Sequence, residues 1–243
     1  MNINQILILN TKEYPDAAKF LIEQNKKRFN YFYPEFNYKV WNQEEIEDMI
    51  KNNFDKDVFI AFKSLKPYCY KSDLARFCIL FLNGGFYFDI HNRPLTHIVP
   101  SQSLMAFRDD QRHSLTSWAM QTSVLYSKNP GHKIFELTIN SIVENVKSKH
   151  YGWSSLAPTG PIPFGKSFVD YNNPTDTIIG DFRQLTGEYP IRNYGFILPD
   201  GNIFALSKNF ASGDINLEGS NNYNELWVRR DVYEENIGID NWV

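Results

Sequence analysis

The chain has 243 residues, a formal net charge of −3 at pH 7 and an isoelectric point of about 6.0. Hydrophobic residues make up 42% and charged residues 22%, the proportions of an ordinary globular domain. Because the chain lacks the basic excess that neutralises phosphates, nucleic acid is excluded as an expected partner. No segment approaches the roughly 18 uninterrupted apolar residues that predict a membrane-spanning helix.

The N-terminal residues lack the basic region and apolar core of a signal peptide, so the expected location is the cytoplasm. Peripheral contact with the inner face of the membrane is compatible with this expectation. Cys69 and Cys78 fall in one predicted helix, about 13 Å apart along its axis, too far for a disulfide. They are expected to be buried free thiols of a reducing compartment.

The first third of the chain alternates short apolar runs with helical patterns. Residues 6–9 form an apolar run typical of a buried parallel strand, and residues 15–30 follow with helical spacing. A second strand is expected at residues 38–41, and helices at 43–52 and 58–65. This β-α-β-α order predicts an α/β fold with a parallel sheet and right-handed crossovers.

The next element is a helix over residues 68–82 that ends at Asn83, Gly84 and Gly85, because glycine terminates helices. A strand is expected at residues 86–90. Further along, strands are expected at 104–108, 123–126, 177–179, 195–198 and 203–206, a helix at 133–147, and loops at 152–165 and 213–224.

The helix over residues 68–82 is apolar almost all round and should be buried. It nevertheless carries Asp73 and Arg76 one turn apart, on the same face. Burying charges costs free energy unless they are paired. The pair is therefore interpreted either as an intrahelical ion pair or as a polar stripe that opens into a ligand site.

The strand that follows favours the ligand site. Tyr87, Asp89 and His91 alternate along the strand and would share one face at its carboxyl end. Open α/β sheets bind ligands at that edge. Asp89 and His91 could hold one divalent cation, which would neutralise a diphosphate leaving group.

These residues together carry a family resemblance. The segment resembles the sugar-binding region of glycosyltransferase family 32 and of the related clostridial glucosylating toxins, through Tyr70, Ser72, Asp73, Arg76, Gly84, Gly85, Tyr87 and Asp89. Weaker similarities are the Pro130-Gly131-His132 turn and the Thr159-Gly160-Pro161 segment. The resemblance is dense over about twenty residues and scattered over the rest of the chain.

The resemblance implies a GT-A fold, a single domain over residues 1–243 with a Rossmann-like, mostly parallel central sheet. Residues 1–100 would bind the nucleotide sugar, and residues 101–243 would form an acceptor half with a C-terminal lid. The implied reaction is the retaining transfer of a hexose from a UDP- or GDP-sugar to a glycan or lipid-linked glycan acceptor. By analogy, the process is surface polysaccharide biosynthesis.

The resemblance also assigns residues. Those implied as catalytic are Asp73, Arg76, Asp89 and Gln121, the last as an amide near the reacting sugar. The expected donor contacts are Asn10, Trp41, Ser72, Asp73, Arg76, Tyr87, Asp89, Ser220 and Asn222, where the last two belong to a polar loop suited to a lid. Asp89 and His91 are the expected ligands of Mn²⁺ or Mg²⁺.

His91 departs from the family, which has a second aspartate at this position. A neutral imidazole binds hard cations less strongly than a carboxylate does. Weakened or altered metal use, metal independence and loss of activity therefore all remain open, and Arg93 could supply part of the positive charge.

No nucleophilic carboxylate can be assigned, so a front-face mechanism with electrostatic stabilisation of the departing diphosphate is favoured over a double displacement. An alternative function is a catalytically inactive nucleotide-sugar or glycan-binding protein with the same fold. A metallo-hydrolase using Asp89 and His91 is a third alternative, disfavoured because a second ligand cluster is missing.

Overall fold

The α/β alternation expected for the first third of the chain is present in the structure, a computed structural model that describes residues 1–11, 13–171, 174–186, 193–207, 221–235 and 237. In chain order the elements are β1 (Asn2–Ile6), α1 (Asp16–Phe32), β2 (Asn37–Trp41), α2 (Gln43–Asn53), α3 (Lys56–Ser64), α4 (Tyr68–Asn83), β3 (Gly85–Phe88), β4 (Arg93–Pro94), β5 (Leu104–Arg108), α5 (Gln111–Ser114), β6 (Met120–Ser127), α6 (Lys133–Lys147), α7 (Pro161–Tyr171), a 3₁₀ turn (Pro174–Asp176), β7 (Thr177–Thr186), β8 (Asn193–Ile197), β9 (Ile203–Leu206) and α9 (Tyr223–Val228).

The described strands form one sheet in the order β2-β1-β3-β6-β5-β7-β8-β9-β4. β1 pairs in parallel with both β2 and β3, and β5 pairs in parallel with β7. The remaining pairings are antiparallel, so the sheet is mixed, with its parallel part built from the N-terminal strands. The predicted α/β class is confirmed.

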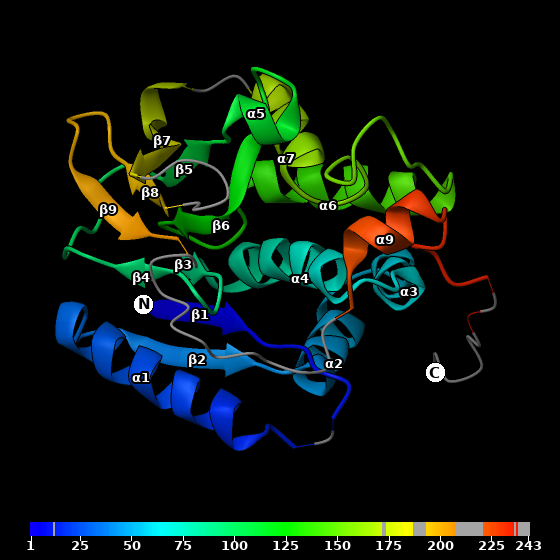
Figure 1. Cartoon of the computed structure of the whole chain (residues 1–243), viewed down its shortest axis with the longest axis horizontal. Coiled ribbons are helices and arrows are strands. Elements are labelled where there is room, and N and C mark those ends of the chain that lie inside the picture. The colour runs from blue at the N-terminus through cyan, green and yellow to red at the C-terminus, as the bar shows by residue number, and fades with distance from the viewer. Residues whose placement is uncertain (12, 172–173, 187–192, 208–220, 236, 238–243) are drawn as a thin grey trace.

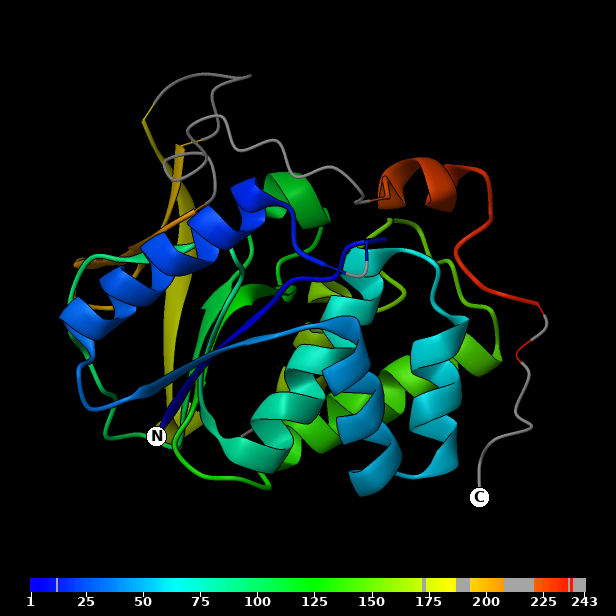
Figure 2. The ribbon, with the colours of Figure 1, turned by 90° about the horizontal axis from the view of Figure 1, so that it is seen from below.

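Helices cover the parallel strands on both sides (Figures 1 and 2). α1 lies on one side of β1 and β2, whereas α2, α3, α4 and α6 lie on the other side (Figure 2). This is the Rossmann-like arrangement that the expected GT-A fold requires, and it brings the carboxyl ends of β1, β2 and β3 to one edge of the sheet. In the described residues, no helix is both long and apolar enough to cross a membrane.

β1 begins earlier than the apolar run suggested. It spans Asn2–Ile6, not residues 6–9, and its polar side chains Asn4 and Gln5 are buried. Each finds partners: the Asn4 amide donates to the Phe86 carbonyl at 3.1 Å, and the Gln5 carbonyl oxygen accepts from the hydroxyl of Tyr38 at 2.6 Å. Buried amides are tolerated when they are hydrogen-bonded, which a hydropathy pattern does not reveal.

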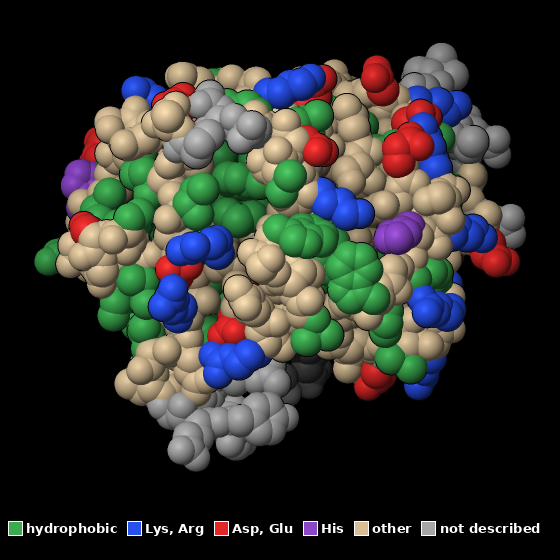
Figure 3. All heavy atoms as spheres, turned by 90° about the horizontal axis from the view of Figure 1, so that it is seen from above, with side chains coloured by type: hydrophobic (Ala, Val, Ile, Leu, Met, Phe, Trp, Pro, Cys, Tyr) green, Lys and Arg blue, Asp and Glu red, His purple; other side chains and the backbone are tan. Residues whose placement is uncertain are grey.

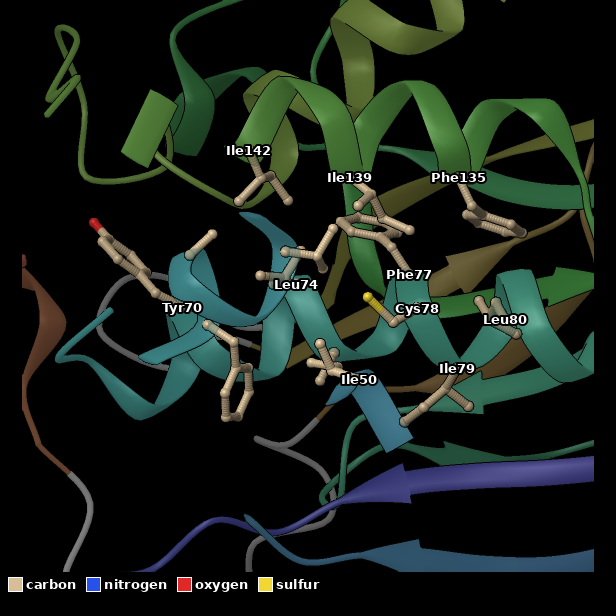
Figure 4. Close-up of a cluster of buried hydrophobic side chains, with 14 of the residues drawn as sticks. Ile50, Tyr70, Leu74, Phe77, Cys78, Ile79, Leu80, Phe135, Ile139 and Ile142 are labelled. Carbon is tan, nitrogen blue, oxygen red and sulfur yellow. The ribbon is translucent and has the colours of Figure 1, made fainter. Parts of the chain in front are cut away.

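α4 is buried between the sheet and α6, as its apolar composition predicted (Figure 4). Leu74 and Phe77 point towards Ile139 and Ile142 of α6, while Ile79 points towards the opposite side of α4 (Figure 4). Both cysteines are free, in line with the expected thiols. Burial raises the pKa of the Cys78 thiol well above its usual range.

The C-terminal half holds the main departures from the expected elements. Helix α7 begins at Pro161, inside the loop expected over residues 152–165, and continues to Tyr171. Pro161 stands at its first position, where a missing N–H costs nothing, so the proline favours a helix start here, not a loop. β7 and β8 also extend beyond the expected strands, because each gains hydrogen bonds from the other.

Gly85, the first residue of β3, has a structural role that is independent of any ligand. Its φ is +83°, and a Cβ built there would lie 2.2 Å from the carbonyl oxygen of Asn2 in β1. Gly85→Ala is therefore expected to lower the free energy of unfolding by about 2 kcal/mol or more. Gly201→Ala is the matched control, because Gly201 has a φ of +87° but open space around it.

Denaturant unfolding measures both variants. The Gly201 variant reports the backbone strain alone, so the excess loss at position 85 measures the contact with β1. Equal losses in the two variants would contradict this account of Gly85.

Candidate functional site

The centre of the site is the guanidinium of Arg76, which α4 places among two carboxylates. Nη2 lies 3.0 Å from Oδ1 of Asp73, one helical turn earlier, and Nη1 lies 3.0 Å from Oδ1 of Asp89. Nη1 also donates to the carbonyl oxygen of Thr122 at 2.8 Å, and Nε donates to the carbonyl oxygen of Ser72 at 3.1 Å. Arg76 thus ties α4 to the ends of β3 and β6.

Tyr87 completes this network from β3. Its hydroxyl donates to Oδ1 of Asp89 at 2.7 Å, and its ring lies 4.7 Å from the guanidinium carbon of Arg76. The side chain of Asp89 is nevertheless 41% exposed, whereas those of Arg76 and Asp73 are 5% and 12% exposed. Asp89 is therefore the member of the network most open to a ligand.

Two threonines hold Asp73, and neither was among the residues expected at the site. Thr159 donates its hydroxyl to Oδ2 at 2.8 Å, and the hydroxyl of Thr122 lies 3.4 Å from Oδ1. Thr159 belongs to the Thr159-Gly160-Pro161 segment that resembled the family, so a signal for it existed. A Cβ at Gly160 would lie 3.0 Å from Oδ2 of Asp73, which explains why a glycine follows Thr159.

Burial and charge act in opposite directions on these groups. Burial raises the pKa of the Asp73 carboxyl, and Arg76 and the Thr159 hydroxyl offset only part of this rise. Burial lowers the pKa of Arg76, but the adjacent Asp89, Tyr87 and Asp73 raise it by more. Arg76 therefore stays protonated, and it supplies the positive charge that allows the carboxylates to lie inside the protein.

Gln121 lies next to this network at the start of β6. Its carbonyl oxygen accepts from the amide of Thr122 at 2.8 Å and from the amide of Ser123 at 3.2 Å, and Nε2 donates to Oδ1 of Asp109 at 3.2 Å. Asp109 is buried, and within the described structure its Oδ2 has no hydrogen-bond partner. Gln121 is thus held in one orientation by the backbone on one side and by a buried carboxyl on the other.

Burial raises the pKa of Asp109 to about 7. A carboxyl with a folded-state pKa above its unfolded value of about 4 binds more protons when folded, so stability falls as pH rises from 4 to 7 and is then constant. Asp109→Asn is expected to remove this slope and to stabilise the protein at pH 8 by about 2 kcal/mol.

Urea unfolding of both proteins at pH 5 and pH 8 measures the effect. The difference between them should be larger at pH 8, where the wild-type carboxylate is ionised. A difference that is equal at the two pH values would show that Asp109 titrates normally.

The other expected donor residues lie in several different elements of the fold. Ser72 is half-buried one turn before Arg76, and Trp41 ends β2, where its Nε1 donates to Oδ1 of Asn4 at 3.0 Å. Asn10 is exposed in the loop after β1. Asn222 caps α9 by accepting from the amide of Asn224 at 3.1 Å, and Ser220 lies outside the described residues.

Asn221, which was not among the expected residues, ties the late chain to α4. Its Oδ1 accepts from the amide of Tyr68 at 2.8 Å, and its Nδ2 donates to the carbonyl oxygen of Lys66 at 2.9 Å. Beside it is a cavity of about 570 Å³, lined by Gln43, Lys63, Leu65, Lys66, Tyr68, Lys71, Asn221, Asn222, Glu225, Leu226, Arg229 and Glu234. Trp227 anchors the same segment by donating its Nε1 to the carbonyl oxygen of Tyr151 at 2.8 Å.

A turn places the two expected metal ligands. β3 ends at Phe88, and the amide of Asn92 donates to the carbonyl oxygen of Asp89 at 2.8 Å. The strand expected up to Ile90 is therefore wrong, and Asp89 and His91 do not share a strand face. The carbonyl oxygen of Ser123 fixes this turn. It accepts from the backbone amide of Asp89 at 2.8 Å and from the side-chain Nδ2 of Asn92 at 2.9 Å.

Among the described residues, no three His, Cys, Asp or Glu side chains form a group that could hold a metal ion. The contacts of Asp89 with Arg76 and Tyr87 both use Oδ1, which leaves Oδ2 outside them. Mg²⁺ commonly binds through one or two carboxylates together with water and substrate phosphates. Asp89 fits a cation that arrives with a diphosphate, and it does not fit a closed cage of protein ligands.

Comparison with known proteins gives a family match over the part of the chain that contains these residues. Residues 16–109 match the family described as "Glycosyltransferase sugar-binding region containing DXD motif". These residues include Asp73, Arg76, Tyr87 and Asp89, so the resemblance inferred from them is confirmed.

A sequence relative extends the similarity beyond that region. The "Uncharacterized glycosyltransferase L373" of Acanthamoeba polyphaga mimivirus is 26% identical over 179 residues, which cover 72% of this chain and 68% of that protein. A solved structure, the PaToxG glycosyltransferase, is 16% identical with a TM-score of 0.47 and covers 70% of this chain and 68% of its own.

Proposed function

We propose that this chain, a glycosyltransferase with a DXD-type sugar-binding region at residues 16–109, moves a hexose from a nucleoside diphosphate sugar to a hydroxyl of a glycan acceptor with retention of configuration. The observation that carries the proposal is the network of Asp73, Arg76, Tyr87 and Asp89. It joins α4 to the carboxyl end of β3, where open α/β sheets bind ligands. A role in surface polysaccharide biosynthesis fits such a reaction.

The proposed roles follow from exposure. Asp89 is open enough to contact the ribose or the diphosphate, while Arg76 and Tyr87 hold its Oδ1 in place. Asp73 is nearly enclosed, and it would accept hydrogen bonds from donor-sugar hydroxyls at the small part of its surface that stays open. Groups held before the substrate arrives stabilise developing charge without reorganisation, which is the main electrostatic contribution to catalysis.

Asp89, with His91 as the second expected ligand, would hold a divalent cation such as Mn²⁺ or Mg²⁺. That cation would neutralise the departing diphosphate. No carboxylate in the described site is placed as an obvious nucleophile, which favours a front-face reaction in which the diphosphate accepts the acceptor proton. Gln121 would lie near the reacting sugar, with its amide oriented by Asp109.

Donor hydrolysis tests the proposal. UDP- and GDP-hexoses would be incubated with the protein in Mn²⁺, in Mg²⁺ and after EDTA treatment, and released nucleotide would be measured. Turnover of at least one donor is expected, and NMR should show retained anomeric configuration in the product. An inverted product would sink the retaining mechanism, and binding of a donor without turnover would favour the alternative of an inactive nucleotide-sugar-binding protein.

A further inference from the structure

Two tryptophans lie together on loops that lead to the threonines in contact with Asp73. The ring centroids of Trp118 and Trp153 are 6.2 Å apart with an interplanar angle of 75°, an edge-to-face pair. Trp153 is 52% exposed, and Trp118 is half-buried. Single exposed apolar residues are common, but two adjacent indoles form an apolar patch, and such patches occur at ligand-binding grooves.

Each tryptophan is followed, within a few residues, by a threonine whose hydroxyl approaches Asp73. Trp118 is four residues before Thr122, and Trp153 is six residues before Thr159. The hydroxyls of both threonines approach the carboxylate of Asp73. Since an extended chain spans at most about 3.5 Å per residue, Trp118 lies within about 14 Å of Thr122 and Trp153 within about 21 Å of Thr159. An oligosaccharide of only a few sugar units could therefore span the distance from either tryptophan to the threonine that follows it.

The loops are packed, so the tryptophans are presented in a fixed geometry. Ala119, Ala157 and Ile162 form a small buried cluster against which Trp118 packs. The hydroxyl of Thr116 accepts from the backbone amide of Trp118 at 3.1 Å. The side-chain Nδ2 of Asn145 donates to the carbonyl oxygen of Pro158 at 2.9 Å.

The two loops that carry the pair contain no charged side chain of their own, although the guanidinium of Arg230 lies 4.7 Å from the ring of Tyr151 in one of them. No Lys, Arg, Asp or Glu occurs in residues 114–119 or 151–165. Residues with hydroxyl side chains adjoin both tryptophans in the sequence instead, in Thr116-Ser117-Trp118 and Trp153-Ser154-Ser155. The molecular surface seen from above, the side on which α5 and the loop leading to α7 lie in Figure 1, has hydrophobic clusters between its charged groups (Figure 3).

We infer that Trp118 and Trp153 form an acceptor platform, on which a neutral sugar unit of the glycan acceptor stacks while a neighbouring unit reaches the donor. The inference rests on the proposed function. An indole offers a flat apolar face that suits the C–H face of a pyranose, and the flanking hydroxyls suit its hydroxyl groups. A phosphorylated or otherwise anionic ligand would lack a cationic partner in these two loops.

Trp153→Ala tests the platform, with Tyr31→Ala as the matched control, because Tyr31 is an 80% exposed aromatic on α1. The probes are p-nitrophenyl hexosides and gluco-, galacto- and manno-oligosaccharides of two to six units. Donor hydrolysis and transfer to these acceptors would be measured in parallel, and oligosaccharide binding would be followed by calorimetry.

Trp153→Ala is expected to lower kcat/KM for transfer by about tenfold or more through a higher acceptor KM, while donor hydrolysis stays within twofold of the wild type. Trp153→Phe should recover part of the transfer, and Tyr31→Ala should change neither rate. Equal transfer by the wild type and Trp153→Ala would overturn the platform.

Failure of the proposed function would look different. If the wild type hydrolyses no donor, calorimetry still decides the platform: binding that Trp153→Ala loses supports it, and absent or unchanged binding overturns it. A wild-type dimer that becomes a monomer in Trp153→Ala would assign the pair to a second copy of the chain and overturn the inference.

Discussion

Replacing Arg76 with alanine is expected to lower the free energy of unfolding by about 3–5 kcal/mol and donor turnover by about 100-fold or more. The guanidinium is 5% exposed and faces Asp73 and Asp89 at 3.0 Å each. Its removal leaves the nearly enclosed carboxylate of Asp73 without a cation and frees Asp89 from its fixed position. Breaking a buried pair from one side costs more than the pair itself contributes.

Chemical denaturation and donor hydrolysis well below the unfolding temperature measure the two effects separately. Arg108→Ala is the control, because Arg108 is a 55% exposed arginine paired with Asp181 at 2.7 Å, and its loss should change stability by less than about 1 kcal/mol. Arg76→Lys keeps the charge but cannot reach Asp73, Asp89 and Thr122 together, so it should recover stability more than activity. Full activity in Arg76→Ala would remove Arg76 from the proposed site.

Asp73→Asn is expected to lower kcat/KM for the donor by about 100-fold while changing stability by less than about 2 kcal/mol. Asparagine preserves the shape, and it can still accept the hydroxyl of Thr159. Arg76 keeps Asp89 as a charged partner, and burial already raises the pKa of the Asp73 carboxyl, so the folded protein gains little from this second charge. The lost property is the ability of a carboxylate to accept strong hydrogen bonds from sugar hydroxyls.

Steady-state kinetics with varied donor, together with urea unfolding, measure these quantities. Asp57→Asn provides the control, since Asp57 is a 56% exposed aspartate paired with Lys147. Activity of Asp73→Asn within threefold of the wild type would mean that the buried Asp73–Arg76 pair only supports the fold. That outcome would favour the intrahelical ion pair over the ligand stripe.

The most accurate predictions were elements with a regular apolar pattern. α6 spans the expected residues 133–147, because the spacing of its apolar side chains reports directly which face is buried. β1 was misplaced because Asn4 and Gln5 resemble surface residues until Phe86 and Tyr38 provide their hydrogen-bond partners. Partners this far apart in the chain leave no local signal.

At the site, too, local spacing predicted some residues and distant contacts decided others. Asp73, Arg76, Tyr87 and Asp89 were found because they lie within one helix and the strand after it, where spacing alone places them near each other. Thr122 and Asp109 were missed as site residues, since only tertiary packing brings Thr122 to Arg76 of α4 and Asp109 to Gln121 of β6. Asn222 remains a predicted donor contact, and in the structure its side-chain oxygen caps α9 by accepting from the amides of Asn224 and Glu225.

Two properties of this protein therefore follow from the sequence without coordinates: an α/β fold, and a buried helix whose polar stripe leads to Asp89. Both depend on residues close together in the chain, where periodicity is enough. The tertiary structure decided that Arg76 is shared by two carboxylates, that Asp89 turns away from the strand geometry towards Asn92, and that two distant loops bring Trp118 and Trp153 together. These depend on long-range packing and on burial, which set charge and orientation only once the chain has folded.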